Sequence, residues 1–373
     1  MRIFFAVPRS AWVDLNLRRS LEDMGHQLVR FDFPGWPDDA DAGWRERGKP
    51  RSNQRLLEAF RAAGRLDLFF GYFYSSVVYP ETLDEIRRSG VPTVNFSCNN
   101  VHQFDLVRDI AAHFDLCVVP ELAAQADFVS VGARPARIQL AANPRVYRPL
   151  PEPRVYDVTF VGQRYADRAE LLQHLYANGV AVRAWGAGWQ ASKRLDAAHV
   201  KAGLALIEDE RWDGVSRLVR QRIGGILGRG SRRSDIRLLS VDTSPFGGPR
   251  LLQRDLVRMF SQSRLSLGFA TAGDSHLAEK RLTHLRLREF EAPMSGALYL
   301  TEDQPELAEY FTPGQEVLTY ADSDDLLDKA RFYLAHQERA ERIRRAGLER
   351  ARREHTWQHR FAELFRTLGL EAA

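Results

Sequence analysis

The residues between 280 and 296 combine two groups that can carry positive charge with a carboxylate, at helical spacing. His284, Arg288 and Glu291 stand at i, i+4 and i+7, so a helix would present them on one face. We expect that helix to end at Pro293 and Gly296. A diphosphate needs fixed positive charge near its oxygens, and a sugar or ribose needs a carboxylate that accepts from its hydroxyls. The alternative is an ordinary helix that carries surface ion pairs.

The elements that must position these residues follow an alternating pattern. Short apolar runs separated by helical segments are typical of βαβ units and a parallel sheet that is covered on both faces. In the first half, we predict strands over 3–7, 28–33, 66–73, 92–96, 116–119 and 137–141, and helices over 13–24, 54–63, 81–89 and 101–113. The alternation restarts near residue 156, with a helix over 166–177 and strands over 180–185, 265–269 and 297–300. The sequence therefore predicts two doubly wound α/β domains, whose ligands would bind at the carboxyl ends of the strands.

Prolines mark the boundary between the two predicted domains. Four of them fall within ten residues, at positions 144, 149, 151 and 153, where neither a helix nor a central strand can continue. We therefore assign residues 1–150 to the first domain and 151–345 to the second. The segment 191–250 breaks the alternation and is interpreted as an insertion. The last segment, 346–373, is expected to form a helix that packs on the first domain.

Composition narrows the class of protein. The formal net charge is only +4, and residues 190–254, with 13 Lys/Arg and 7 Asp/Glu, account for all of the excess. The two cysteines, Cys98 and Cys117, lie in apolar runs and are predicted to be buried thiols, which excludes a disulfide scaffold. Because the first residues do not resemble a signal peptide and no apolar run reaches membrane-spanning length, a cytoplasmic protein is expected.

The second half of the chain resembles the CgeB-type spore-maturation glycosyltransferases. The resemblance rests on Arg288-x-Phe290-Glu291 followed by Gly296, and it covers most of residues 156–361 apart from the insertion. It implies the GT-B architecture, in which two Rossmann-like domains face each other across a cleft and the second holds the donor. It also implies transfer of a hexosyl group from a nucleotide-diphosphate sugar, with no cofactor and no essential metal. Retaining enzymes of this kind often carry a second glutamate eight positions before the first, and Thr283 stands there, so the stereochemistry stays open.

The same resemblance gives roles to individual residues of the second domain. It places Glu291 where a carboxylate contacts the donor's ribose or sugar hydroxyls, and Arg288 beside the diphosphate. Gly162 and Arg164 form the turn after the strand that begins near residue 156, where the glycine would allow close backbone approach and the next helix would favour an anion. Lys280 would reach the same phosphates. A plain tight turn and a solvated lysine are the alternatives.

An inverting enzyme also needs a base that takes the proton of the acceptor hydroxyl. His102, Asp105 and Asp14 follow predicted strands of the first domain and are the candidates, with helix-capping or surface roles as the alternative. Tyr72 and Tyr74 would line an acceptor groove or belong to the core. The acidic run at 38–41 lies in a loop flanked by proline and glycine and is interpreted as a solvated turn, so no metal site is predicted.

The acceptor is expected to be a cell-envelope glycan, a lipid-linked saccharide or a protein. The basic insertion would contact an anionic acceptor or the anionic inner face of the membrane, or it would simply be solvated. A protein that keeps the fold and binds nucleotide sugars without turnover, as a scaffold, is the second hypothesis. Nucleic-acid binding ranks last, because aromatic residues that could stack on bases are scarce among the arginines of the insertion.

Overall fold

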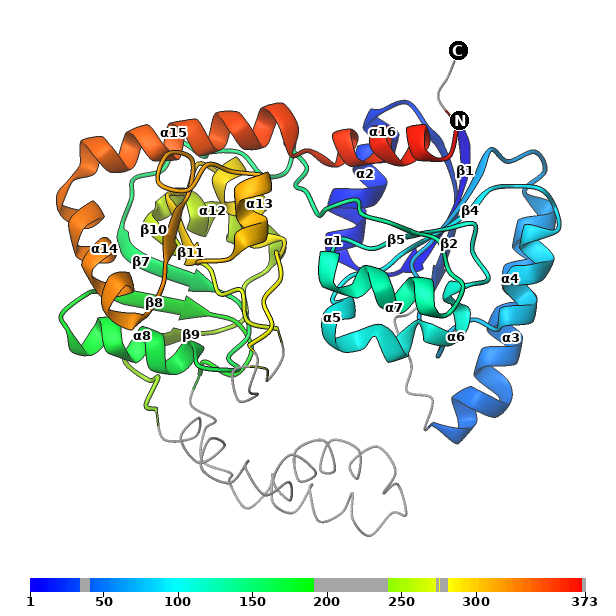
Figure 1. Ribbon diagram of the computed structural model, residues 1–373, viewed down its shortest axis with the longest axis horizontal. Helices are drawn as coiled ribbons and strands as arrows, with labels where there is room; N and C mark the ends of the chain where they lie inside the picture. Colours follow the sequence, from blue (N-terminus) through cyan, green and yellow to red (C-terminus); the bar gives the residue numbers. More distant parts are fainter. Residues whose placement is uncertain (34–40, 191–240, 273–274, 276–280, 371–373) are drawn as a thin grey trace, which may run out of the picture. The chain divides into compact units, whose positions relative to one another are not determined.

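The computed structural model describes residues 1–33, 41–190, 241–272, 275 and 281–370 (Figure 1). These residues form two compact units, one made of Met1–Val146 and Arg353–Ala373, the other of Tyr147–Arg352. Each unit contains a six-stranded sheet among its described residues, and every strand pair in both sheets is parallel. The predicted α/β fold class is confirmed. Lys280, Asp38, Asp39 and most of the predicted insertion lie outside the described residues.

The sheet of unit 1 has the strand order β2-β1-β3-β4-β5-β6. Its strands are β1 (Arg2–Pro8), β2 (Gln27–Phe33), β3 (Leu68–Gly71), β4 (Thr93–Phe96), β5 (Leu116–Val118) and β6 (Pro135–Ala136). The central strand β1 is buried from Ile3 to Pro8, as expected for a strand that is covered on both faces. Its Phe4 stacks on Phe69 of β3 with ring centroids 5.5 Å apart, within the core of this unit.

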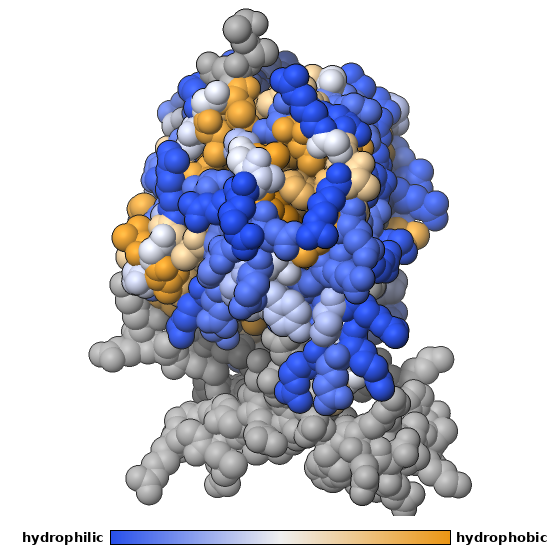
Figure 2. All heavy atoms as spheres, turned by 90° about the vertical axis from the view of Figure 1, so that its right-hand side faces the viewer, coloured by the Kyte–Doolittle hydropathy of each residue, from blue (hydrophilic) through white to orange (hydrophobic). Residues whose placement is uncertain are grey.

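Helices pack around this sheet, and their exposed faces are charged. They are α1 (Ala11–Val13), the π-helical turn Asp14–Arg18, α2 (Arg19–Asp23), the π-helical turn Trp44–Gly48, α3 (Lys49–Ala62), α4 (Pro80–Arg87), α5 (Asn100–Gln103), α6 (Arg108–Ala111), α7 (Gln125–Ser130) and α16 (Trp357–Thr367), with 3-10 turns at Phe104–Leu106 and Leu122–Ala124. Helix α3 buries Leu56 and Phe60 and exposes Arg51 and Arg55. The side of the molecule drawn in Figure 2 is accordingly hydrophilic over most of its area, with apolar patches between the charged side chains.

One predicted strand of unit 1 is wrong. Residues 137–141 do not join the sheet, whose edge strand is β6. The guanidinium of Arg360, from α16, donates to the carbonyl oxygens of Gln139 at 3.1 Å and Leu140 at 3.4 Å. The side chain of Gln139 also accepts from the backbone N–H of Leu140. Backbone groups that a sheet ladder would use are therefore bonded to side chains.

The sheet of unit 2 has the strand order β12-β11-β10-β7-β8-β9. Its strands are β7 (Tyr156–Val161), β8 (Val182–Trp185), β9 (Gly247–Gly248), β10 (Ser263–Leu267), β11 (Tyr299–Glu302) and β12 (Leu318–Tyr320). Its helices are α8 (Arg168–Ala177), α12 (Gln253–Gln262), α13 (Arg288–Met294), α14 (Ser323–Ala335) and α15 (Gln337–Glu354), with a 3-10 turn at Pro305–Glu309. Strands β8 and β9 extend the sheet on one side of β7, and β10 to β12 extend it on the other. This reversal between β7 and β10 is where doubly wound sheets bind ligands, outside the carboxyl ends of the strands.

Candidate functional site

A buried arginine opens helix α8, directly after the turn that follows β7. Arg168 is 4% exposed, and its guanidinium carbon lies 3.7 Å from the centre of the Tyr165 ring. Its two terminal nitrogens donate to the carbonyl oxygen of Gln163 at 2.8 Å and to the hydroxyl of Tyr165 at 2.6 Å, while Nε has no partner among the described residues. Burial lowers the pKa of Arg168 to about 10. A buried cation whose hydrogen-bond acceptors are neutral retains its capacity to bind an anion.

A second arginine, Arg286, lies near the same tyrosine ring. The guanidinium carbon of Arg286 is 5.7 Å from the centre of the Tyr165 ring. Its Nε donates to the carbonyl oxygen of Phe269 at 3.1 Å, and its Nη2 donates to that of Thr271. The positive charge of Arg286 contributes, after burial, to the lowered pKa of Arg168. The structure therefore brings together two cations, 118 positions apart in the sequence, whose described hydrogen-bond acceptors are all neutral.

A third arginine, Arg281, connects segments that lie at the carboxyl ends of three strands of the sheet. Arg281 pairs with Asp167, the residue before α8, at 2.9 Å and with Glu302, the last residue of β11, at 2.7 Å. The other oxygen of Glu302 accepts from the backbone N–H groups of Ala270 and Thr271 at 3.0 and 3.2 Å. This clamp fixes the loop after β10 against β11 and the start of α8. The prediction from sequence included none of Arg168, Arg281 and Arg286, although each lies within eight residues of a predicted site residue.

The predicted polar stripe forms only in part. Helix α13 begins at Arg288, so His284 lies in the loop before it and not on the helical face. The loop is not helical because it pairs with the segment after β10: Thr283 bridges Thr271, and the N–H of His284 donates to the carbonyl oxygen of Ala270 at 3.1 Å. Pro293 lies inside the helix, and Gly296, with φ of 76°, follows its end. The expected placement of His284 was therefore wrong, as was the role of Pro293 as a helix stop.

Arg288 and Glu291 do share a face of α13, one turn apart. Glu291 is fully buried, and its carboxylate accepts from the Tyr147 hydroxyl at 2.5 Å and pairs with Arg288 through its other oxygen. Arg288 keeps 30% of its side chain exposed and also donates to the carbonyl oxygen of Val161, at the end of β7, at 3.4 Å. Burial lowers the pKa of Arg288. The exposed surface of this pair belongs to the Arg288 side chain, whereas the Glu291 carboxylate has no surface from which to contact a sugar hydroxyl directly.

The backbone of the turn after β7 is hydrogen-bonded to two tryptophans, Trp185 and Trp189. The N–H of Gly162 donates to the carbonyl oxygen of Trp185 at 2.9 Å, and its carbonyl oxygen accepts from the Trp189 indole at 2.7 Å. An added Cβ at Gly186, whose φ is 144°, would overlap the carbonyl oxygen of Gly162. Arg164 donates to the Thr243 hydroxyl at 3.2 Å. Gly186 is therefore required for close packing against this turn, and Arg164 contacts the segment before β9. The expected approach of a donor to Gly162 stays a prediction.

In unit 1, the predicted acceptor residues are largely interior. Tyr72 is 6% exposed and forms a hydrogen bond with Sγ of the half-buried Cys98 at 3.2 Å, while Tyr74 is half-buried and packs edge-on against Tyr72. Burial raises the pKa of both phenols and raises the pKa of the Cys98 thiol to about 12. These groups are held protonated at neutral pH. Tyr72 therefore belongs to the core, and Tyr74 is the one of the two that keeps substantial exposed surface.

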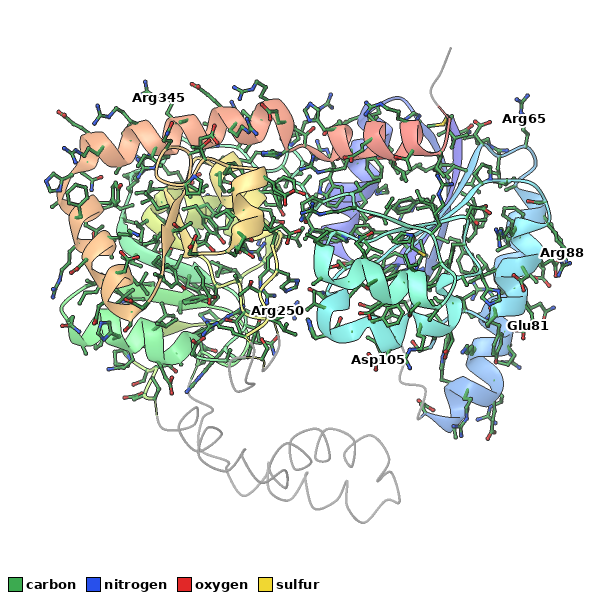
Figure 3. All side chains as sticks on the ribbon, in the orientation of Figure 1. Arg65, Glu81, Arg88, Asp105, Arg250 and Arg345 are labelled. Atoms are coloured by element: carbon green, nitrogen blue, oxygen red, sulfur yellow. The ribbon has the colours of Figure 1, made fainter. Side chains whose placement is uncertain are left out.

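Two of the three candidate bases lie on adjoining turns of unit 1. His102 is exposed on α5. Asp105 is exposed on the 3-10 turn that follows (Figure 3). Asp14 lies in the π-helical turn and pairs with Arg18 at 2.7 Å and Arg30 at 3.4 Å. The ion pairs of Asp14 favour a structural role for that carboxylate.

The turn that carries His102 is held by a buried glutamate that the sequence did not single out. Glu121 is 3% exposed and accepts from the backbone N–H groups of Asn99 and Asn100 and from the Asn100 amide at 2.9 Å. Asn99 has a left-handed backbone, with φ of 67°. A non-glycine residue in this conformation persists where its surroundings fix it, as the Glu121 carboxylate does here.

The described residues contain neither a metal-binding cluster nor a membrane-spanning helix. No group of three or more His, Cys, Asp or Glu side chains among them is arranged to hold a metal ion. No helix in the described part of the chain is long and apolar enough to cross a membrane.

A surface hollow of about 620 Å³ lies along α15, where Arg154, Arg342 and Arg345 alternate with glutamates. It is distant in the fold from the carboxyl ends of the strands, so we do not assign the site there.

Part of the chain is similar to a known protein family. Residues 231–366, which include Arg281, Arg286 and Arg288, match the model of a family described as glycosyl transferase-like. No curated protein matches the chain.

Solved structures match over nearly the whole chain at low sequence identity. Sucrose-phosphate synthase from Thermosynechococcus elongatus is 15% identical, with a TM-score of 0.60 and 99% of each chain covered. HepE of Anabaena, solved with UDP-glucose, is 12% identical, with a TM-score of 0.57 and 99% of each chain covered. The UDP-forming α,α-trehalose-phosphate synthase from Burkholderia vietnamiensis is 14% identical, with a TM-score of 0.55 and coverage of 98% of this chain and 99% of that one. This chain therefore has the GT-B fold, as predicted. The narrower CgeB-type assignment stays a prediction.

Proposed function

We propose that the protein is a glycosyltransferase that moves a hexosyl group from a nucleotide-diphosphate sugar to a glycan, a lipid-linked saccharide or a protein. The observation that carries the proposal is the set of arginines at the carboxyl ends of the unit 2 strands. Five of them contact the turn after β7 or the segments beside it: Arg164, Arg168, Arg281, Arg286 and Arg288. The family match in the same region and the sugar-nucleotide complex of a structural neighbour support the same chemistry.

The chemistry of such a cluster suits a diphosphate leaving group. Charge builds up on the diphosphate as the bond to the sugar breaks, and donors fixed in advance stabilise that charge without reorganising. Arg168 and Arg286 supply fixed positive charge, because both are anchored to backbone carbonyls or to Tyr165. Arg288 adds a partly exposed side chain, and Lys280 and Arg164 remain proposed contributors. In this proposal arginines replace the divalent cation that other transferases use, so transfer proceeds without a metal.

The acceptor side of the proposal rests on unit 1. His102 and Asp105 are exposed, so either can reach a hydroxyl group and take its proton if the enzyme inverts configuration. His102 is the stronger candidate, because histidine is the side chain that most often acts as a general base. Tyr74 is the proposed aromatic wall for a sugar acceptor, since Tyr72 lies inside the core.

Binding of nucleoside diphosphates tests the donor site. Purified protein is titrated with UDP, GDP, TDP, CDP and ADP, with and without EDTA, and thermal unfolding is followed. A ligand at a hundred times its dissociation constant stabilises the folded state by about 2.7 kcal/mol, which moves the melting temperature measurably. UDP is tested first, because the HepE structures hold UDP or UDP-glucose. We expect one diphosphate to stabilise the protein equally with and without EDTA.

Two matched substitutions test whether the diphosphate binds beside Arg288. Arg288→Gln should weaken binding of the stabilising diphosphate at least tenfold. Arg345→Gln removes the same charge from the outer face of α15, where the side chain is 70% exposed, and should leave binding unchanged (Figure 3). If none of the five diphosphates raised the melting temperature, the proposal would be contradicted. Binding without any transfer to a panel of acceptors would favour the scaffold hypothesis.

A further inference from the structure

The first residues of unit 2 are fastened to the helix that carries the donor-site arginine. Unit 2 begins at Tyr147, whose side chain is fully buried and whose hydroxyl donates to Glu291 at 2.5 Å. Further along the same segment, the N–H of Leu150 donates to the hydroxyl of Ser261 on α12 at 3.0 Å. Glu152 pairs with Arg258, also on α12, at 2.8 Å. Of these three contacts, the one made by Tyr147 reaches α13.

That contact belongs to a chain of charged and polar groups. Tyr147 bonds one oxygen of Glu291, Arg288 pairs with the other, and Arg288 also donates to Val161 at the end of β7. Glu291 has no exposed surface, so its carboxylate depends on these two partners for its orientation. A carboxylate held from both sides leaves its cationic partner few alternative positions. Arg288 is the member of the chain with exposed surface.

We propose that Tyr147 is a positioning residue of the donor site: it fixes Glu291, Glu291 fixes Arg288, and Arg288 contacts the diphosphate of the donor. This inference rests on the proposed function and gives Glu291 a different role from direct contact with sugar hydroxyls. Because coupling between two sites is reciprocal, a diphosphate bound to Arg288 also stabilises the attachment of Tyr147 to α13. Occupancy of the site is thereby communicated to the segment with which unit 2 begins.

Two substitutions distinguish an effect of Tyr147 through Glu291 and Arg288 from a general destabilisation of the segment that begins unit 2. Tyr147→Phe removes only the hydroxyl that Glu291 accepts from. Ser261→Ala removes the bond to Leu150, so it loosens the same segment without touching Glu291. With the diphosphate that stabilises the wild type, calorimetric titration should show about tenfold weaker binding by Tyr147→Phe. Ser261→Ala should bind within about twofold of the wild type.

The same pair of measurements in the Arg288→Gln background completes a double-mutant cycle. If Tyr147 acts through Arg288, adding Tyr147→Phe to Arg288→Gln changes the affinity by less than about twofold. Equal losses in both backgrounds would show that Tyr147 supports the fold without acting through Arg288, and would overturn the inference. So would wild-type affinity of Tyr147→Phe, or an equal loss in Ser261→Ala. If the wild type binds none of the five diphosphates, the proposed function fails first and this inference falls with it.

Discussion

Glu289 of helix α13 should make the stability of the protein depend on pH. Glu289 is fully buried; it accepts from the N–H of Arg286 at 2.9 Å and lies 3.4 Å from the Thr301 hydroxyl, with Tyr299 nearby. Burial raises its pKa from 4.5 to about 7, and the charge of Arg286 only partly opposes this effect. Glu291, by contrast, has an arginine directly on its carboxylate.

The sign of the stability effect follows from proton binding. Between pH 4.5 and 7 the folded protein holds the Glu289 proton while the unfolded chain has lost it. The favourable contribution is therefore complete below about pH 4.5 and disappears as the pH rises through 7. Since one pKa unit corresponds to about 1.4 kcal/mol, the whole change amounts to about 3 kcal/mol. Most of it, about 2–3 kcal/mol, falls between pH 5 and 8.

Replacing Glu289 by glutamine removes the titration and keeps an acceptor for the N–H of Arg286. Urea unfolding at pH 5 and pH 8 should show that Glu289→Gln gains about 2–3 kcal/mol relative to the wild type on going to the higher pH. Glu349→Gln, at an exposed position on α15, should show no such gain. If the stability difference between Glu289→Gln and the wild type is the same at both pH values, the carboxyl group does not titrate in this range and the reasoning is refuted.

Three substitutions and one condition test other parts of the structure. Arg168→Gln should weaken nucleoside diphosphate binding about tenfold by calorimetric titration, because it removes the buried cation at the start of α8. Gly186→Ala should destabilise the protein by more than about 3 kcal/mol in thermal unfolding, because its Cβ would overlap the carbonyl oxygen of Gly162. Thr356→Ala should cost about 1 kcal/mol in the same assay, because Thr356 and His359 form a capping box at the start of α16. Incubation with EDTA should leave diphosphate affinity unchanged; a loss restored by Mg²⁺ would contradict metal-independent binding.

The fold was predictable because burial on both faces of a parallel sheet leaves a strong signal. Five consecutive apolar residues predicted a strand over 3–7, and β1 spans Arg2–Pro8. The restart of the pattern near residue 156 coincides with β7, and the strand predicted over 265–269 corresponds to β10. Helical spacing also predicted that Arg288 and Glu291 share a face, and the two are paired in the structure.

The site was less predictable because its contacts join distant segments. His284 fits a helical period, but the backbone around it pairs with residues 270–272, and local periodicity cannot reveal that competition. Arg168 and Arg286 both contact Tyr165, although 118 positions separate them in the sequence. Helical spacing and the family resemblance singled out Glu291, but neither indicated what the two glutamates contact. The Glu291 carboxylate contacts Arg288 and Tyr147, while the Glu289 carboxylate contacts an N–H group and a hydroxyl.

The distribution of partners within the arginine cluster argues for a ligand more strongly than its net charge does. Arg281 pairs with two carboxylates and Arg288 with one, so much of their charge is already compensated within the fold. Arg168 and Arg286 donate to neutral oxygens, and both contact the Tyr165 ring. Their two positive charges repel each other. A carboxylate nearby, or an apolar residue in place of one arginine, would relieve that repulsion. In the proposed donor complex, the diphosphate would compensate both charges at once. The arrangement is therefore easier to explain by what the site binds than by what it adds to the stability of the empty protein.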